Sequence, residues 1–107
     1  MINRFMRVFV FFDLPVYTKK LRKEYAKFRK FLINDGFFML QYSVYTKIAR
    51  NHDDANQCIL SVKSNLPAHG SVRLLSVTEK QYAAMQILVG EATREEDFLK
   101  TKEILEF

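Results

Sequence analysis

The chain has 107 residues, and 49% of them are hydrophobic, which suffices for one domain with a single core. This composition excludes a chain disordered throughout, and the presence of only three glycines and two prolines excludes a collagen-like or linker-like chain. The single cysteine, Cys58, excludes an internal disulfide and a cysteine-rich zinc site, so we expect a cytoplasmic protein.

The net charge of +5 is distributed unevenly along the chain. Residues 1–50 carry eleven Lys and Arg against three Asp and Glu, whereas residues 51–107 carry six against nine. A basic first half predicts an anionic partner, and an acidic end predicts a protein partner or a solubilising tail. We therefore expect a core domain over residues 1–90 and an acidic C-terminal arm over residues 91–107.

Residues 4–12 are predicted to form a strand that is buried on both faces, because most of them are β-branched or aromatic. In strand geometry one face carries Phe5, Arg7, Phe9, Phe11 and Asp13, and the other carries Met6, Val8, Val10 and Phe12. The apolar run over residues 8–12 is shorter than the roughly 7–15 residues of a secretory signal core and the roughly 18 of a membrane span. No membrane association is therefore expected.

Thr18 is the predicted N-cap of a helix that runs to about Asp35 and is terminated by Gly36. The apolar stripe of this helix consists of Leu21, Tyr25, Phe28 and Leu32. Its other residues are strongly basic, with Glu24 the only acid among Lys19, Lys20, Arg22, Lys23, Lys27, Arg29 and Lys30. A helix surface with charges of one sign is typical of phosphate binding, so nucleic acid is the expected partner.

The rest of the chain predicts further strands and one more helix. In chain order these are a strand (37–47), a helix capped by Asn51 (52–66), a loop (67–70), a strand (71–78) and a short strand (85–89). A third strand of the core must be short or hidden between residues 44 and 50, because no clear turn signal lies there.

This order of elements predicts an α+β fold, namely a ferredoxin-like βαββαβ sandwich with an extra C-terminal strand. Two helices cover one face of such a sheet. The other face would present Phe5, Phe9 and Phe11, which is more aromatic surface than a monomer normally exposes. We therefore expect a homodimer that stacks these two faces.

Asp13 is the one acid whose position suggests chemistry, because it ends a buried strand directly before a turn. A carboxylate there is well placed to bind Mg²⁺ or Mn²⁺, and in a two-fold dimer Asp13 would meet its own copy. The alternative is that Asp13 only caps the turn or the first helix, and spacing alone favours this role. We interpret His52 and His69 as cap or loop residues and Cys58 as a core residue, because their spacing is not that of metal ligands.

The pattern Val8-Phe9-Val10-Phe11-Phe12-Asp13-Leu14-Pro15, then a basic helix, then Gln41-Tyr42-Ser43-Val44-Tyr45, resembles the family of CRISPR-associated protein two. That family is the small subunit of the spacer-acquisition machinery, and the resemblance is greatest to type II members. It implies a ferredoxin-like homodimer whose added C-terminal strand reaches the partner protomer. It also implies a complex in which this dimer bridges two dimers of the CRISPR-associated integrase, protein one, and braces a short DNA duplex.

The resemblance places Asp13 at the family's metal-binding acid, and Lys20 and Arg22 at basic positions early in the first helix. Some members are described as metal-dependent ribonucleases or deoxyribonucleases. Many members carry an Arg directly before the Gln of the second strand, where this chain has Phe38-Met39-Leu40. Because that cation would stabilise charge on a scissile phosphate, its loss favours a scaffold over a nuclease.

Three hypotheses follow from the sequence. The leading one is a scaffold that binds duplex DNA through Lys19, Lys20, Arg22, Lys23 and Lys27. The alternative is an endonuclease in which Asp13 from each protomer binds Mg²⁺ or Mn²⁺ and water is the nucleophile. The third, single-stranded RNA binding by stacking, requires Phe5, Phe9 and Phe11 to be exposed in a monomer.

Overall fold

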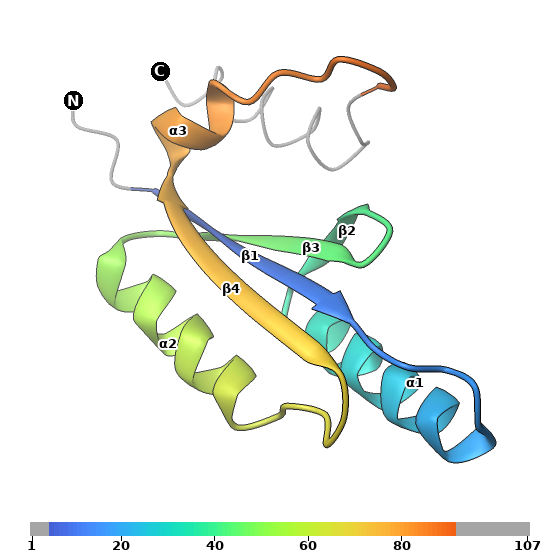
Figure 1. Cartoon of the computed structure of the whole chain (residues 1–107). Coiled ribbons are helices and arrows are strands. Elements are labelled where there is room, and N and C mark those ends of the chain that lie inside the picture. Colours follow the sequence, from blue (N-terminus) through green and yellow to red (C-terminus); the bar gives the residue numbers. More distant parts are fainter. Residues whose placement is uncertain (1–4, 92–107) are drawn as a thin grey trace.

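The computed structural model describes residues 5–91, which form an α+β arrangement of helices and strands (Figure 1). In chain order they are β1 (Met6–Asp13), α1 (Lys19–Asn34), β2 (Phe38–Gln41), β3 (Val44–Ala49), α2 (His52–Lys63), β4 (Ser71–Thr78) and α3 (Glu79–Ala83). Apart from Glu91, the predicted acidic arm lies outside the described residues.

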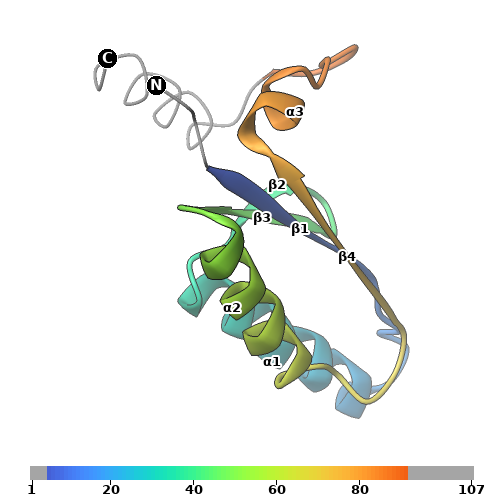
Figure 2. The ribbon, with the colours of Figure 1, turned by 90° about the vertical axis from the view of Figure 1, so that its left-hand side faces the viewer.

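The strands form one antiparallel sheet in the order β2-β3-β1-β4. With the element order β1-α1-β2-β3-α2-β4, this is the ferredoxin-like α+β fold, so the predicted fold class is confirmed. Helices α1 and α2 lie on the same side of the sheet, as Figure 2 shows. Within residues 5–91, no helix is both long and apolar enough to cross a bilayer.

The core lies between β1 and the two covering helices. β1 is an interior strand, because it pairs with β3 on one side and with β4 on the other. Its helix-facing side chains are at most 5% exposed and belong to one cluster with residues of α1 and α2: Phe28, Leu32, Ala55, Cys58 and Val62. The rings of Phe12 and Phe28 meet edge to face, with centroids 5.4 Å apart.

The segment 37–47, predicted as a single strand, is two strands joined by a two-residue turn. Gln41 pairs with Val44, and Ser43 between them has a left-handed backbone with a φ of 63°. The Ser43 carbonyl accepts a hydrogen bond of 3.1 Å from the backbone N–H of Phe12, which holds the turn beside the end of β1. The turn lacks the Gly or Asn-Gly that usually marks it, although β3 does occupy the predicted interval.

The second sheet face is covered at one end by α3, which the sequence pattern did not predict. Thr78 and Gln81 form a capping box at the start of this short helix. The ring of Tyr82 lies 5.7 Å from that of Phe9, and Phe9 is only 7% exposed. The expectation that Phe9 is exposed in a monomer is therefore wrong. The single-stranded RNA hypothesis required that exposure, so it loses one of its three stacking residues. Phe11 remains exposed at 37%.

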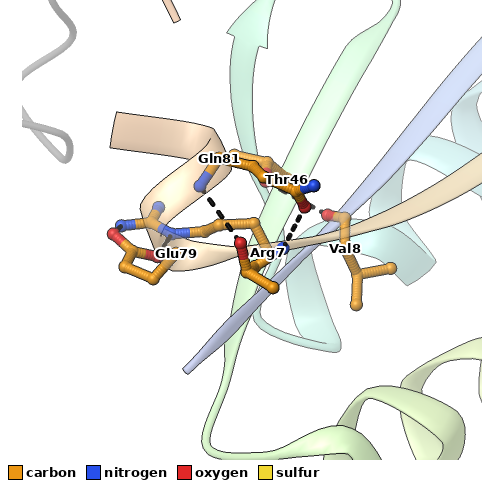
Figure 3. A network of polar contacts seen from close by, with 6 residues as sticks. Arg7, Val8, Thr46, Glu79 and Gln81 are labelled. Atoms are coloured by element: carbon orange, nitrogen blue, oxygen red, sulfur yellow. Dashed lines mark hydrogen bonds and ion pairs between the residues drawn. The ribbon is translucent and has the colours of Figure 1, made fainter. Parts of the chain in front are cut away.

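A buried ion pair joins α3 to β1 (Figure 3). Arg7 donates its Nε hydrogen to Glu79 Oε2 at 2.6 Å and its Nη2 hydrogen to Glu79 Oε1 at 2.9 Å. The two side chains are only 3% and 6% exposed, and the guanidinium also stacks 4.1 Å from the ring centre of Tyr82. Because both charges have left water, each depends on the other to remain buried.

Residues 85–89, predicted as a short strand, form none, and no strand follows β4 within the described chain. The segment leaves α3 with its apolar side chains exposed, and Leu88 and Val89 are 86% and 95% exposed. A strand requires a neighbouring edge with which to form hydrogen bonds. The predicted extra C-terminal strand therefore does not form within residues 5–91 of a single chain.

We predict that Glu79→Ala lowers the free energy of unfolding by about 3–5 kcal/mol, because it leaves the Arg7 guanidinium buried without its partner. Urea unfolding at fixed protein concentration measures the loss. The matched control is Lys80→Ala on the exposed side of the same helix, and the double variant Arg7→Met with Glu79→Leu should recover most of the stability. A loss for Glu79→Ala no larger than that of Lys80→Ala contradicts the prediction.

Candidate nucleic-acid interface

Helix α1 begins where the sequence pattern predicted. The Thr18 hydroxyl oxygen accepts a hydrogen bond from the Leu21 backbone N–H at 3.1 Å, which satisfies one of the free donors of the first turn. Arg22 donates to the Val16 carbonyl at 3.0 Å and so ties the helix to the loop that follows β1. Since Leu21 and Phe28 are buried against the sheet, the basic residues point outward.

All seven cations of α1 are exposed, and we call them the basic face: Lys19, Lys20, Arg22, Lys23, Lys27, Arg29 and Lys30. The first turn of the helix contains no acid, so its positive dipole end adds to the field of the neighbouring lysines. The only acid of α1, Glu24, lies 3.1 Å from the Nδ1 atom of His69. The sequence-predicted binding residues therefore share one surface of a single sign.

Asp13 lies at the other candidate position, the end of β1. Its Cα pairs with that of Ser71 on β4, and its exposed side chain shares the sheet face with Phe11. Gly70 packs closely against this strand end. A Cβ added to Gly70 would lie 2.7 Å from the Asp13 carbonyl oxygen, and the φ of Gly70 is +94°. Only glycine fits this approach without moving the backbone of Asp13.

The residues around Asp13 fit a divalent cation only in part. Within residues 5–91 no three His, Cys, Asp or Glu side chains gather at a metal-binding spacing. The Asp13 carboxylate itself has no ion pair or side-chain hydrogen bond in that part of the chain. Mg²⁺ in proteins needs only one or two carboxylates when water and substrate phosphate complete its coordination. One chain therefore supplies one fitting ligand, and a second copy would supply another.

The structure does not bring Asp13 and the basic face together. By strand alternation the Asp13 side chain lies on the sheet face opposite the one that α1 covers. Besides Arg7, the Asp13 face carries a second cation that the sequence did not predict there: Arg73 of β4 pairs with Phe11 and is exposed. Arg73 carries no motif of its own, and only the strand register places it beside Asp13.

The remaining candidates have the structural roles that the sequence predicted. His52 is the first residue of α2, which Asn51 caps by accepting from the Asp54 backbone N–H. Cys58 is a core residue, and burial raises the pKa of its thiol, an effect that Lys47 only partly opposes.

Tyr25 beneath the basic face also keeps its proton. Burial raises the pKa of its phenol, and a hydrogen bond with Tyr42 raises it further. The tyrosine therefore adds no negative charge to this surface at neutral pH.

This protein is a small ferredoxin-like protein with a basic helix face and a carboxylate at a strand end. That combination matches the class of proteins that the sequence pattern resembles. The family model described as CRISPR associated protein Cas2 matches residues 6–85. The chain therefore belongs to the Cas2 family.

Individual relatives agree with this assignment. The CRISPR-associated endoribonuclease Cas2 of Acidovorax ebreus (strain TPSY) is 53% identical over 85 residues, covering 79% of this chain and 83% of that protein. The protein of the same name from Treponema denticola is 49% identical over 100 residues, covering 94% and 97%. That of Ligilactobacillus salivarius (strain UCC118) is 49% identical over 90 residues, covering 84% and 89%.

We predict that Gly70→Ala destabilises the fold by more than the roughly 1–3 kcal/mol of backbone strain alone, because the new methyl group would meet the Asp13 carbonyl. Gly90→Ala is the matched control, since Gly90 has a similar φ of +106° but no atom within 4 Å of an added Cβ. Thermal or urea unfolding of both variants measures the difference. Equal losses for the two variants contradict the proposed packing of Gly70 on the strand end.

Proposed function

We propose that this protein is a CRISPR adaptation scaffold that binds short duplex DNA through the basic face. The observation that carries the proposal is the exposure of all seven α1 cations with no acid in the first turn and with Glu24 held by His69. Duplex DNA carries a regular array of phosphates, and a row of exposed lysines and arginines binds them without regard to base sequence. Membership of the Cas2 family supports the CRISPR context.

The scaffold acts as a homodimer in this proposal. Its support is the sheet face that α3 covers only in part, since Phe11 and Leu75 on that face are 37% and 52% exposed. A second copy stacked there would bury both side chains and bring two basic faces into one particle. Such a dimer bridges two dimers of the CRISPR-associated integrase, protein one, while the DNA spans the two basic faces.

We predict that the double variant Lys19→Glu with Lys23→Glu weakens duplex binding at least tenfold, because the two side chains lie one helical turn apart on the basic face. Acids near a helix N-terminus favour the helix, so this variant should remain folded. Fluorescence anisotropy with a labelled duplex at several salt concentrations measures the affinity. The slope of log affinity against log salt should become shallower by about 0.9 for each phosphate that the variant no longer neutralises.

The control for this experiment is Lys63→Glu with Lys80→Glu, which changes the net charge equally at exposed positions of α2 and α3. The control should bind DNA with nearly unchanged affinity and salt slope. If both double variants lose affinity to the same extent, binding follows net charge alone, and the basic face is not the interface.

An endonuclease is the second candidate, because the Asp13 side chain is exposed, has no side-chain partner in the described chain and lies at a strand end packed closely against Gly70. The relatives named above as endoribonucleases support it. In this candidate Asp13 of each protomer would hold Mg²⁺ or Mn²⁺, which would supply Lewis acidity and lower the pKa of a bound water. Water forms the new bond to phosphorus, the bond to the leaving oxygen breaks, and that oxygen takes up a proton.

For this candidate we predict that Asp13→Asn lowers the cleavage rate of an end-labelled RNA at least about a hundredfold, and that a chelator abolishes cleavage by the unaltered protein. The Asp13→Asn variant should still bind duplex DNA, because Asp13 is not on the basic face. Cleavage by Asp13→Asn at the rate of the unaltered protein would assign the activity to another site or to a contaminant.

A further inference from the structure

The contact between Glu24 and His69 is the one place where a residue from outside α1 meets a charge of that helix's outer surface. Glu24 is the only acid of α1 and lies among its seven cations. The Nδ1 atom of His69 lies 3.1 Å from Glu24 Oε2. The carboxylate side chain is 23% exposed and the histidine side chain 56%, so both form part of the surface that a ligand of α1 would meet.

No other charged group is paired with Glu24 in the described part of the chain. Lys20 and Lys27 lie one helical turn before and after it, yet neither forms an ion pair with it. His69 is the only titratable side chain in the loop of residues 64–70. The charge that directly faces Glu24 is therefore set by whether His69 carries a proton.

The elements that adjoin this loop place His69 without competing for it. The next residue, Gly70, packs against the Asp13 carbonyl, which places the loop against the end of β1. The charged side chains nearest the loop along α2, β1 and β4 are those of Lys63, Asp13 and Arg73. None of the three forms an ion pair with His69 within residues 5–91.

The Glu24–His69 pair lies on the side of the sheet that the proposed homodimer does not use. The dimer would cover Phe11 and Leu75, whereas α1 covers the opposite face of the sheet (Figure 2). A second copy stacked on those two residues would therefore leave the pair accessible. A duplex that binds the basic face would meet it.

The charge of this pair matters to a polyanion. With a neutral imidazole the pair has the charge of its carboxylate, which repels phosphates, and with an imidazolium its two charges cancel. Histidine is the side chain that ordinarily changes its charge near neutral pH. Neighbouring phosphates favour the imidazolium, because opposite charges stabilise the charged form. Protonation and duplex binding must then strengthen each other, since such coupling is reciprocal.

We propose that His69 belongs to the duplex-binding surface, where it screens the only acid of α1 and takes up a proton from solvent when DNA binds. This inference rests on the proposed binding of duplex DNA by the basic face. It extends that surface from α1 to the loop before β4 and gives it a dependence on pH that lysines and arginines alone would not confer.

The pH profile of duplex binding tests the proposal. By fluorescence anisotropy at one salt concentration, the unaltered protein should bind about fivefold more tightly at about pH 6 than at about pH 8. His69→Gln should bind equally at both, because its amide can still donate to Glu24 but carries no charge. His52→Gln is the matched control, since His52 is the only other histidine and is exposed at the start of α2. It should keep the profile of the unaltered protein.

Two further variants separate the charge of His69 from a purely structural role. His69→Lys carries its charge at both pH values, so at about pH 8 it should bind as tightly as the unaltered protein does at about pH 6. Glu24→Gln should bind about fivefold more tightly than the unaltered protein at about pH 8, because the acid is gone. Weak binding by both variants at about pH 8 would contradict screening.

Proton uptake is measured directly by NMR. At about pH 7 the Cε1–H resonance of His69 should move toward its protonated position when duplex is added, and that of His52 should not. If His69→Gln keeps the pH profile of the unaltered protein, or the His69 resonance does not respond, this inference is overturned while the basic face stands. If the unaltered protein binds no duplex at either pH, the proposed function fails, and this inference fails with it.

Discussion

The burial of β1 on both faces is the constraint on which the rest of the structure depends. One face packs Val8 and Val10 beneath α1 and α2, and the other places Arg7 and Phe9 beneath α3. Because the second face carries an arginine, its cover must supply a carboxylate, and Glu79 does so with two hydrogen bonds. If only one face of β1 were apolar, its other face could lie in water, and neither α3 nor a second protein chain would be needed to cover it.

The same sheet separates two surfaces that the sequence presents as neighbours. Asp13 and Lys19 are close along the chain, yet the sheet face of Asp13 is not the one that α1 covers. The proposed DNA binding by the basic face and the candidate phosphodiester chemistry at Asp13 would therefore use different surfaces, which substitutions can alter independently. The lack of an arginine before Gln41 argues against a nuclease.

The elements predicted well are those whose signals are local. The spacing of Leu21, Phe28 and Leu32 and the cap at Thr18 depend only on neighbours along the chain, and both are confirmed. The turn at Ser43 was missed because a serine there adopts a positive φ without any turn signal. Residues 85–89 were predicted as a strand from composition, although a strand also requires an edge beside it.

The sequence by itself determined the ferredoxin-like fold class, the basic character of α1 and the place of Asp13 at a strand end. The last two follow from periodicity, capping or composition within about 16 residues, the length of α1. The tertiary structure alone decided that Glu79 neutralises Arg7 across 72 residues and that Arg73 lies diagonal to Asp13. Such pairings depend on strand register and on how one layer covers another, and no local pattern encodes either.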